Sequence, residues 1–247
     1  MKKVLLIGSQ HGDEKLGALL IQYITEHYHE LLPSITYILA NPQAYERNIR
    51  YLETDMNRSY VDTPTTYEEH RASQLLDRLN DESADIALDL HTTRCVQPPS
   101  YIVYQPNSEA RRYMELSSIG IVVHMSQDMT KRSLIGKNNS VISVEVQDDT
   151  ISSELLESLV CDILNYLTDT PAKVQKTHYE VTGHILKSEI TEEDASSLNN
   201  FQLFKDDYYP ILTGNNSYKR NTHYLGFKAR KLGATVRQAV NNGINKV

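Results

Sequence analysis

Two side chains near the start of the chain have the types and the spacing of a metal site. His11 and Glu14 lie three residues apart in the turn from Gly8 to Gly17, directly after the apolar run 4–7. A strand that ends in such a turn can aim an imidazole and a carboxylate at one point. This pairing suits Zn²⁺, because two histidines and one glutamate form a known catalytic ligand set. A short motif is only a hypothesis until its context agrees, so the prediction of zinc depends on a third ligand elsewhere in the chain.

The segment Asp89-Leu90-His91-Thr92-Thr93 supplies the candidate for that third ligand, His91. It closes an expected strand, and a catalytic zinc site combines three protein ligands with an open position for water. Asp89 and His91 are two residues apart, so both side chains point to the same side of a strand. We therefore expect Asp89 to orient a zinc-bound His91 through a hydrogen bond, with capping of a neighbouring helix as the alternative.

A long polar segment, residues 43–66, lies between these two motifs and lacks clear periodicity. Loops of this length in compact domains are usually functional or disordered. Arginine suits the binding of carboxylates, because it makes a planar two-pronged contact that lysine cannot copy. The candidate residues are Arg47, Arg50, Asn57 and Arg58, and Asp55 is expected to brace the loop through hydrogen bonds. A solvated loop with surface ion pairs is the alternative interpretation.

Apolar runs and helical periodicity predict the elements that must position these side chains. We expect strands at 4–7, 35–40, 85–90, 101–104, 120–124 and 141–146, and helices at 16–28, 68–79, 110–116 and 153–167. Strands that alternate with helices indicate an α/β fold whose strand ends collect on one face, where ligands bind. Beyond residue 172 the stretches 178–186, 201–204 and 208–212 look like β structure. The chain is therefore predicted to divide into an α/β domain, residues 1–172, and a small β-rich C-terminal domain, residues 173–247.

Composition and charge narrow the classes of function. The 247 residues have a formal net charge of −7 and no dense Lys/Arg run, which argues against a nucleic-acid partner. Cys95 and Cys161 are the only cysteines, which favours a reducing, cytoplasmic setting over a disulfide framework. No apolar stretch approaches the roughly 20 residues that a membrane span requires, so we expect no membrane partner.

Four motifs occur in an order that is typical of one family. They are His11-Gly12-Asp13-Glu14, the block from Asn41-Pro42 to Asp55-Met56-Asn57-Arg58, Asp89-Leu90-His91-Thr92-Thr93, and the late Glu145. Together they resemble the succinylglutamate desuccinylase/aspartoacylase family, whose members are relatives of the zinc carboxypeptidases. The segment 208–218 looks like the tyrosine-bearing C-terminal segment of that family. The resemblance implies a central mixed sheet flanked by helices, as in the zinc carboxypeptidases.

The resemblance also implies a metal site and a general base. One Zn²⁺ per chain would be held by His11, Glu14 and His91, which makes residues 1–172 a zinc hydrolase domain. Glu145 would take a proton from water and return it to the leaving amine. An acid inside the apolar run around Glu145 is in any case costly to bury unless it has a function.

The remaining implied roles concern the substrate. Arg50 would stabilise the negative charge that develops on the carbonyl oxygen. Asn57 and Arg58 would bind a carboxylate of the amino-acid half of the substrate. Arg132 and Tyr218 fall where the family places further substrate-binding groups, although simple solvent exposure is the alternative for Arg132.

These observations predict a zinc-dependent amidohydrolase, or deacylase, that cleaves the amide bond of a small N-acyl amino acid bearing at least one carboxylate. The sequence departs from the family at Asp13, where asparagine is common, and lacks the glycines usual around Glu145 and a tyrosine before Arg132. The acyl-group specificity therefore does not transfer.

The alternatives are a zinc carboxypeptidase acting on short peptides and a non-catalytic metal-binding homologue. A homo-oligomer is compatible with the sequence. Nucleotide binding is set aside, because the first turn has no phosphate-binding glycine pattern.

Overall fold

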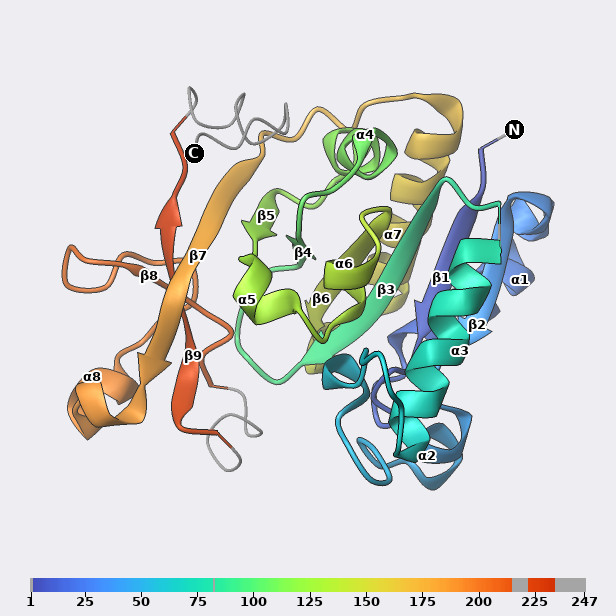
Figure 1. Ribbon diagram of the computed structural model, residues 1–247. Coiled ribbons are helices and arrows are strands. Elements are labelled where there is room, and N and C mark those ends of the chain that lie inside the picture. Colours follow the sequence, from blue (N-terminus) through green and yellow to red (C-terminus); the bar gives the residue numbers. More distant parts are fainter. Residues whose placement is uncertain (1, 82, 215–221, 234–247) are drawn as a thin grey trace.

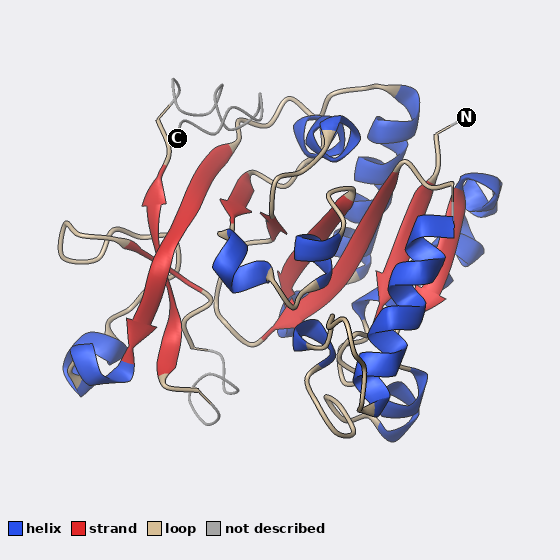
Figure 2. Cartoon of the chain, in the orientation of Figure 1, coloured by secondary structure: helices blue, strands red, loops and turns tan. Residues whose placement is uncertain are grey.

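A computed structural model describes residues 2–81, 83–214 and 222–233 of the chain, and its strands form one nine-stranded sheet (Figures 1 and 2). The strand order is β2-β1-β3-β6-β4-β5-β7-β9-β8. The strands are β1 (Val4–Gly8), β2 (Ile35–Leu39), β3 (Ile86–Thr93), β4 (Ser100–Val103), β5 (Ile121–His124), β6 (Val141–Gln147), β7 (Thr177–Leu186), β8 (Tyr209–Ile211) and β9 (Tyr224–Lys231). The sheet is mixed: β4 runs antiparallel to β6, while β1, β2, β3 and β6 are parallel to one another. The predicted α/β fold with a central mixed sheet flanked by helices is confirmed.

Helices cover both faces of the sheet. They are α1 (Leu16–His27), α2 (Pro42–Arg47), α3 (Tyr67–Asp81), α4 (Ser108–Leu116), α5 (Gln127–Thr130), α6 (Leu134–Lys137), α7 (Ser153–Thr168) and α8 (Glu192–Ser196), with the short 3₁₀ turns η1 (His29–Ser34), η2 (Met56–Arg58), η3 (Asp148–Thr150) and η4 (Lys187–Glu189). Helices α1, α4 and α7 pack into one hydrophobic cluster, and α3, α5 and α6 pack on the opposite face (Figure 1). No helix of the described part of the chain is long and apolar enough to cross a membrane.

Burial on both faces explains why the strands are nearly continuous apolar runs. In β6, Ile142 and Val144 join the cluster under α1 and α7, while Val141 joins the cluster under α3. Glu145 alternates with Val144 and therefore shares its face with Val141. A slip of one residue in the register would bury Glu145 among apolar side chains, so the apolar pattern fixes the face on which this carboxylate appears.

The ends of most predicted elements agree with the structure to within a few residues, with two exceptions. The predicted strand at 201–204 is wrong: only an isolated bridge joins Phe204 to Tyr208 there. The segment 43–66 is not a plain loop, because it contains α2 and η2. Asn41 caps α2 by accepting a hydrogen bond from the Ala44 N–H (3.3 Å), and Pro42 occupies the first turn, where proline is favoured.

The C-terminal segment continues the same sheet rather than forming a separate one. Strand β7 lies parallel to β5, with Val122 opposite His178, and β9 pairs with β7. Helix α8 adds a short helical element to this β-rich region. The division of the chain at residue 172 stays a prediction.

The buried carboxylate of Glu68, in the first turn of α3, organises the segment between α2 and α3. Glu68 is 0% exposed, and it accepts hydrogen bonds from the backbone N–H groups of Leu52 (2.7 Å), Glu53 (3.1 Å) and Thr54 (3.1 Å). The side-chain amide of Asn41 donates a further one (3.2 Å). These contacts fix the backbone just before Asp55, Asn57 and Arg58. The carboxylate of Glu68, which is distant in sequence, therefore orders this segment.

Replacing Glu68 with alanine is expected to destabilise the protein by roughly 2–4 kcal/mol, because three backbone donors lose their buried partner. Asp77→Ala changes an exposed acid on the same helix and serves as the matched control. Denaturant unfolding of both variants measures the difference. Equal stability of the two variants would show that Glu68 does not organise this segment.

Candidate metal centre

The turn after β1 presents His11 and Glu14 at the carboxyl end of the sheet. The backbone N–H of Gly12 donates to the Arg50 carbonyl oxygen (3.0 Å), and that of Glu14 donates to the His11 carbonyl oxygen (3.0 Å). A Cβ atom on Gly12 would lie 2.1 Å from the carbonyl carbon of Ala44, so only glycine allows this approach to α2. The turn is therefore clamped against the segment that contains Arg50.

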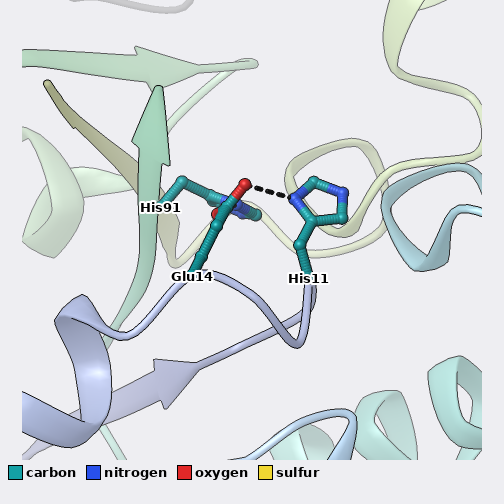
Figure 3. Close-up of side chains that lie close together, drawn as sticks. All are labelled: His11, Glu14 and His91. Atoms are coloured by element: carbon teal, nitrogen blue, oxygen red, sulfur yellow. Dashed lines mark hydrogen bonds and ion pairs between the residues drawn. The ribbon is translucent and has the colours of Figure 1, made fainter. Parts of the chain in front are cut away.

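The structure brings His11, Glu14 and His91 together in the buried interior, as Figure 3 shows. One ligand atom from each residue lies within 4.8 Å of the other two. The Nδ1 atom of His11 is 2.7 Å from Glu14 Oε1, and the Nδ1 atom of His91 is 2.9 Å from Glu14 Oε2. His91 lies inside β3, which runs three residues beyond the predicted strand end at 90, and this places its ring against the first turn.

Each imidazole has a second carboxylate on its other nitrogen. The Nε2 atom of His11 lies 2.9 Å from Asp55 Oδ1, and the Nε2 atom of His91 lies 2.9 Å from Asp89 Oδ2. A carboxylate at Nε2 keeps the proton there and leaves the Nδ1 lone pair for a metal ion. The contact expected between Asp89 and His91 is therefore present in the structure, and Asp55 has an equivalent contact with His11.

A buried network holds Asp89 in place. Its Oδ2 atom accepts a hydrogen bond from the side-chain amide of Gln10 (2.7 Å), and the hydroxyl of Tyr60 donates to Gln10 Oε1 (2.7 Å). Asp89 and Gln10 are each 1% exposed. Asp89 lies in β3, Gln10 follows β1 and Tyr60 follows η2, so the groups that orient the His91 ring come from three segments of the chain.

The electrostatics of the three residues fit a divalent cation. Burial acts to raise the pKa of Glu14, but the two neighbouring imidazoles hold it well below its usual range. Burial acts to lower the pKa of His11 and of His91, yet the surrounding carboxylates outweigh it and raise both. Positive charge is thus favoured at the point where both Nδ1 atoms face Glu14. Two imidazole nitrogens and one carboxylate are a ligand set that zinc accepts.

A cavity of about 300 Å³ opens beside these ligands. The side chains that line it are His11, Glu14, Arg50, Tyr51, Asp55, Asn57, Arg58, His91, Thr92, Glu145, Leu212, Thr222 and Tyr224. Glu145 is the register partner of His91 on the adjacent strand, so its carboxylate projects from the same face of the sheet. Burial raises the pKa of Glu145 to about 7, which suits a group that accepts and returns a proton near neutral pH.

Arg50 lies between the candidate ligand Glu14 and Asp55. Its Nη1 atom is 3.5 Å from Glu14 Oε1, and its Nη2 atom is 3.2 Å from Asp55 Oδ2. Asp55 also accepts a hydrogen bond from the Asn57 N–H (3.0 Å) and so caps η2, which presents Asn57 and Arg58 to the cavity. This bond agrees with the bracing role expected of Asp55.

Of the predicted substrate-binding residues, Arg132 does not line the cavity. The Arg132 side chain is 56% exposed and its Nη2 atom is 3.3 Å from Glu69 Oε1, a carboxylate that also accepts hydrogen bonds from the residues before α3. Tyr218 lies outside the described residues. The roles of both stay predictions.

Sequence reasoning missed several residues of the cavity wall. Leu212 lies in the segment 208–218, of which the sequence singled out only the tyrosine, and Thr222 and Tyr224 lie beyond it, where no local motif marks a site. Tyr51 directly follows Arg50 in the sequence, and Thr92 directly follows His91. This adjacency to predicted site residues could have indicated that both line the cavity.

The chain is similar to known proteins over most of its length. Residues 1–157 match the family model of the succinylglutamate desuccinylase/aspartoacylase catalytic domain. A probable aspartoacylase of Prochlorococcus marinus subsp. pastoris is 32% identical over 111 residues, which are 42% of this chain and 38% of that protein. A probable aspartoacylase of Nostoc sp. is 27% identical over 190 residues, 68% of this chain and 64% of that protein. The matches thus span less than two thirds of these relatives.

Two solved structures share the fold. Murine aminoacylase 3 superposes with a TM-score of 0.68 at 20% identity, over 94% of this chain and 95% of that chain. The succinylglutamate desuccinylase of Chromobacterium violaceum gives a TM-score of 0.69 at 15% identity, over 94% of this chain and 85% of that chain. The architecture therefore extends through the C-terminal region and beyond the part that the family model matches.

Gly12→Ala is expected to reduce zinc affinity at least tenfold and to destabilise the protein by about 1–3 kcal/mol, because the added methyl group must displace the turn or α2. Gly183→Ala is the matched control, since a Cβ atom there meets nothing within 4 Å. Calorimetric zinc titration and thermal unfolding measure both effects. If Gly12→Ala binds zinc with wild-type affinity, the close approach of the turn at Gly12 to α2 does not position the candidate ligands.

Proposed function

The chain belongs to the succinylglutamate desuccinylase/aspartoacylase family, and on that premise we propose that it is a zinc-dependent amidohydrolase that removes the acyl group from a small N-acyl amino acid. The observation that supports this most strongly is the arrangement of five side chains around one cavity. Three of them are the candidate ligands, and the others are a carboxylate with a raised pKa and an arginine. A binding protein would need the ligands but neither Glu145 nor Arg50.

His11, Glu14 and His91 would hold the zinc ion, with Asp55 and Asp89 orienting the two rings. Bound zinc supplies a Lewis acid for the amide carbonyl and lowers the pKa of water. Both Nδ1 atoms already face Glu14 at hydrogen-bond distance, so the backbone directs the three side chains toward one point, and the side chains would separate to admit the ion.

Glu145 would act as the proton carrier of the reaction. Its carboxylate accepts a proton from the attacking water and delivers it to the amine that leaves, so the group must exist in both forms at neutral pH. The pKa of about 7 matches that requirement. Arg50, which lines the same cavity, would offer N–H groups to the oxygen on which negative charge develops.

Asn57 and Arg58 would recognise a carboxylate of the substrate. Both line the cavity and follow directly from the 3₁₀ turn capped by Asp55. The cavity volume of about 300 Å³ lies at the small end of ligand pockets, which favours a single acylated amino acid over a long peptide. Arg132 and Tyr218 remain proposed contributors to substrate binding, the cytoplasmic location remains a prediction, and a homo-oligomer stays compatible with the sequence.

The test is hydrolysis of a panel of N-acetyl, N-succinyl and N-formyl amino acids, with short peptides included, by the zinc-loaded protein. We expect release of a carboxylic acid from an N-acyl amino acid, and a loss of activity of about a hundredfold or more in Glu145→Gln, which cannot carry the proton. Glu154→Gln, at an exposed acid of α7, is the control. Trimming of the peptides instead would identify a carboxypeptidase. Full activity of Glu145→Gln would refute the proposed role of this residue.

A further inference from the structure

A buried serine beside the proposed base has no hydrogen-bond partner in the described part of the chain. Ser100, the first residue of β4, is 1% exposed, and its Oγ atom is unpaired among the described residues. Buried side-chain hydroxyls nearly always have a partner, so an unpaired one in a cavity region requires an explanation.

The sheet register places this hydroxyl next to Glu145. Ser100 and Glu145 are directly opposite each other in the antiparallel pair of β4 and β6. Residues opposite in such a pair project from the same face, with Cβ atoms about 4.5–5.5 Å apart. The chain just before β4 also follows β6, because the backbone N–H of Gln97 donates to Gln147 Oε1 (3.2 Å). The two groups form no hydrogen bond in the structure, but the register places their side chains close enough for a rotamer change of Glu145 to bring its carboxylate to the Ser100 hydroxyl.

The carboxylate of Glu145 interacts with the neighbouring imidazoles of His91 and His11 through charge, without a directional hydrogen bond among the described residues. His91 flanks it on the opposite side in the register, but both nitrogens of that ring face Glu14 and Asp89. No hydrogen bond links Glu145 to another side chain of the described residues. A glutamate side chain that keeps its rotamer freedom is a poor base, because proton transfer requires an oxygen at hydrogen-bond distance in a defined direction.

We propose that Ser100 is a positioning residue for Glu145: its hydroxyl donates a hydrogen bond to one carboxylate oxygen and leaves the other directed at the cavity. The inference rests on the proposed function, in which Glu145 is the base. Such a bond would satisfy the buried hydroxyl and hold the carboxylate in one rotamer. A serine that merely fills space would have neither effect.

The kinetic test compares three variants with the wild type on the substrate identified from the panel. Ser100→Ala removes the hydroxyl and is expected to lower kcat about tenfold or more, with KM changed less than about twofold, because one hydrogen bond to a charged group is lost. Ser100→Thr retains a hydroxyl on a β-branched residue suited to a strand and should restore most of kcat. Ser117→Ala removes a buried hydroxyl, 0% exposed, that caps the end of α4 and should leave kcat unchanged.

A structural measurement tests the same point without reference to activity. Crystal structures of the wild type and of Ser100→Ala should show Glu145 in one conformer near Ser100 Oγ in the former and in other rotamers in the latter. Both proteins should unfold within a few degrees of each other, so that the comparison concerns orientation alone.

The outcomes separate the two proposals. Wild-type hydrolysis together with an equally active Ser100→Ala would overturn the positioning role and leave the proposed function intact. A wild type that hydrolyses nothing on the panel would count against the proposed function, and the crystal structures would then test the contact between Ser100 and Glu145. An identical Glu145 conformer in both proteins would overturn the positioning role. Loss of that conformer in Ser100→Ala would support it.

Discussion

The carboxylate of Glu14 is the group on which the geometry of the site depends. Each of its oxygens faces one imidazole, at 2.7 Å from His11 and 2.9 Å from His91, and Oε2 also accepts the backbone N–H of Thr92 (3.1 Å). A buried carboxylate of this kind is costly unless it is surrounded by donors or cations. The turn after β1 and the end of β3 supply them.

The parallel strands at the centre of the sheet explain how residues so far apart in sequence meet. Their carboxyl ends lie at one edge, and β1, β3 and β6 are neighbours there. His11 follows β1, His91 is at the end of β3 and Glu145 is near the end of β6, so adjacent strands supply two candidate ligands and the proposed base. The register Ser100–Glu145–His91 then runs straight across three strands. One row of the sheet thus links the proposed metal site to the proposed proton carrier.

Much of this arrangement could be predicted from the sequence, because it is encoded locally. The apolar runs place His11 and His91 at strand ends, and period-two alternation puts Asp89 on the same side as His91. What could not be predicted depends on contacts between distant segments. In the sequence, Glu68 has the pattern of an ordinary residue of an amphipathic helix. In the structure it orders the backbone at 52–54 through hydrogen bonds that no sequence pattern predicts. The prediction of β structure at 201–204 failed because only a single bridge, Phe204 to Tyr208, forms there. Tyr224 reaches the cavity wall from β9, which pairs with β7.

We propose that two Nδ1 atoms and the Glu14 carboxylate bind one zinc ion. The most direct measurement is anomalous diffraction from crystals of the zinc-loaded protein at wavelengths on either side of the zinc absorption edge. We expect one strong peak per chain, about 2.0–2.2 Å from the Nδ1 atoms of His11 and His91 and bound to Glu14. A peak on the Nε2 atoms, at another cluster of residues, or no zinc peak at all would contradict it.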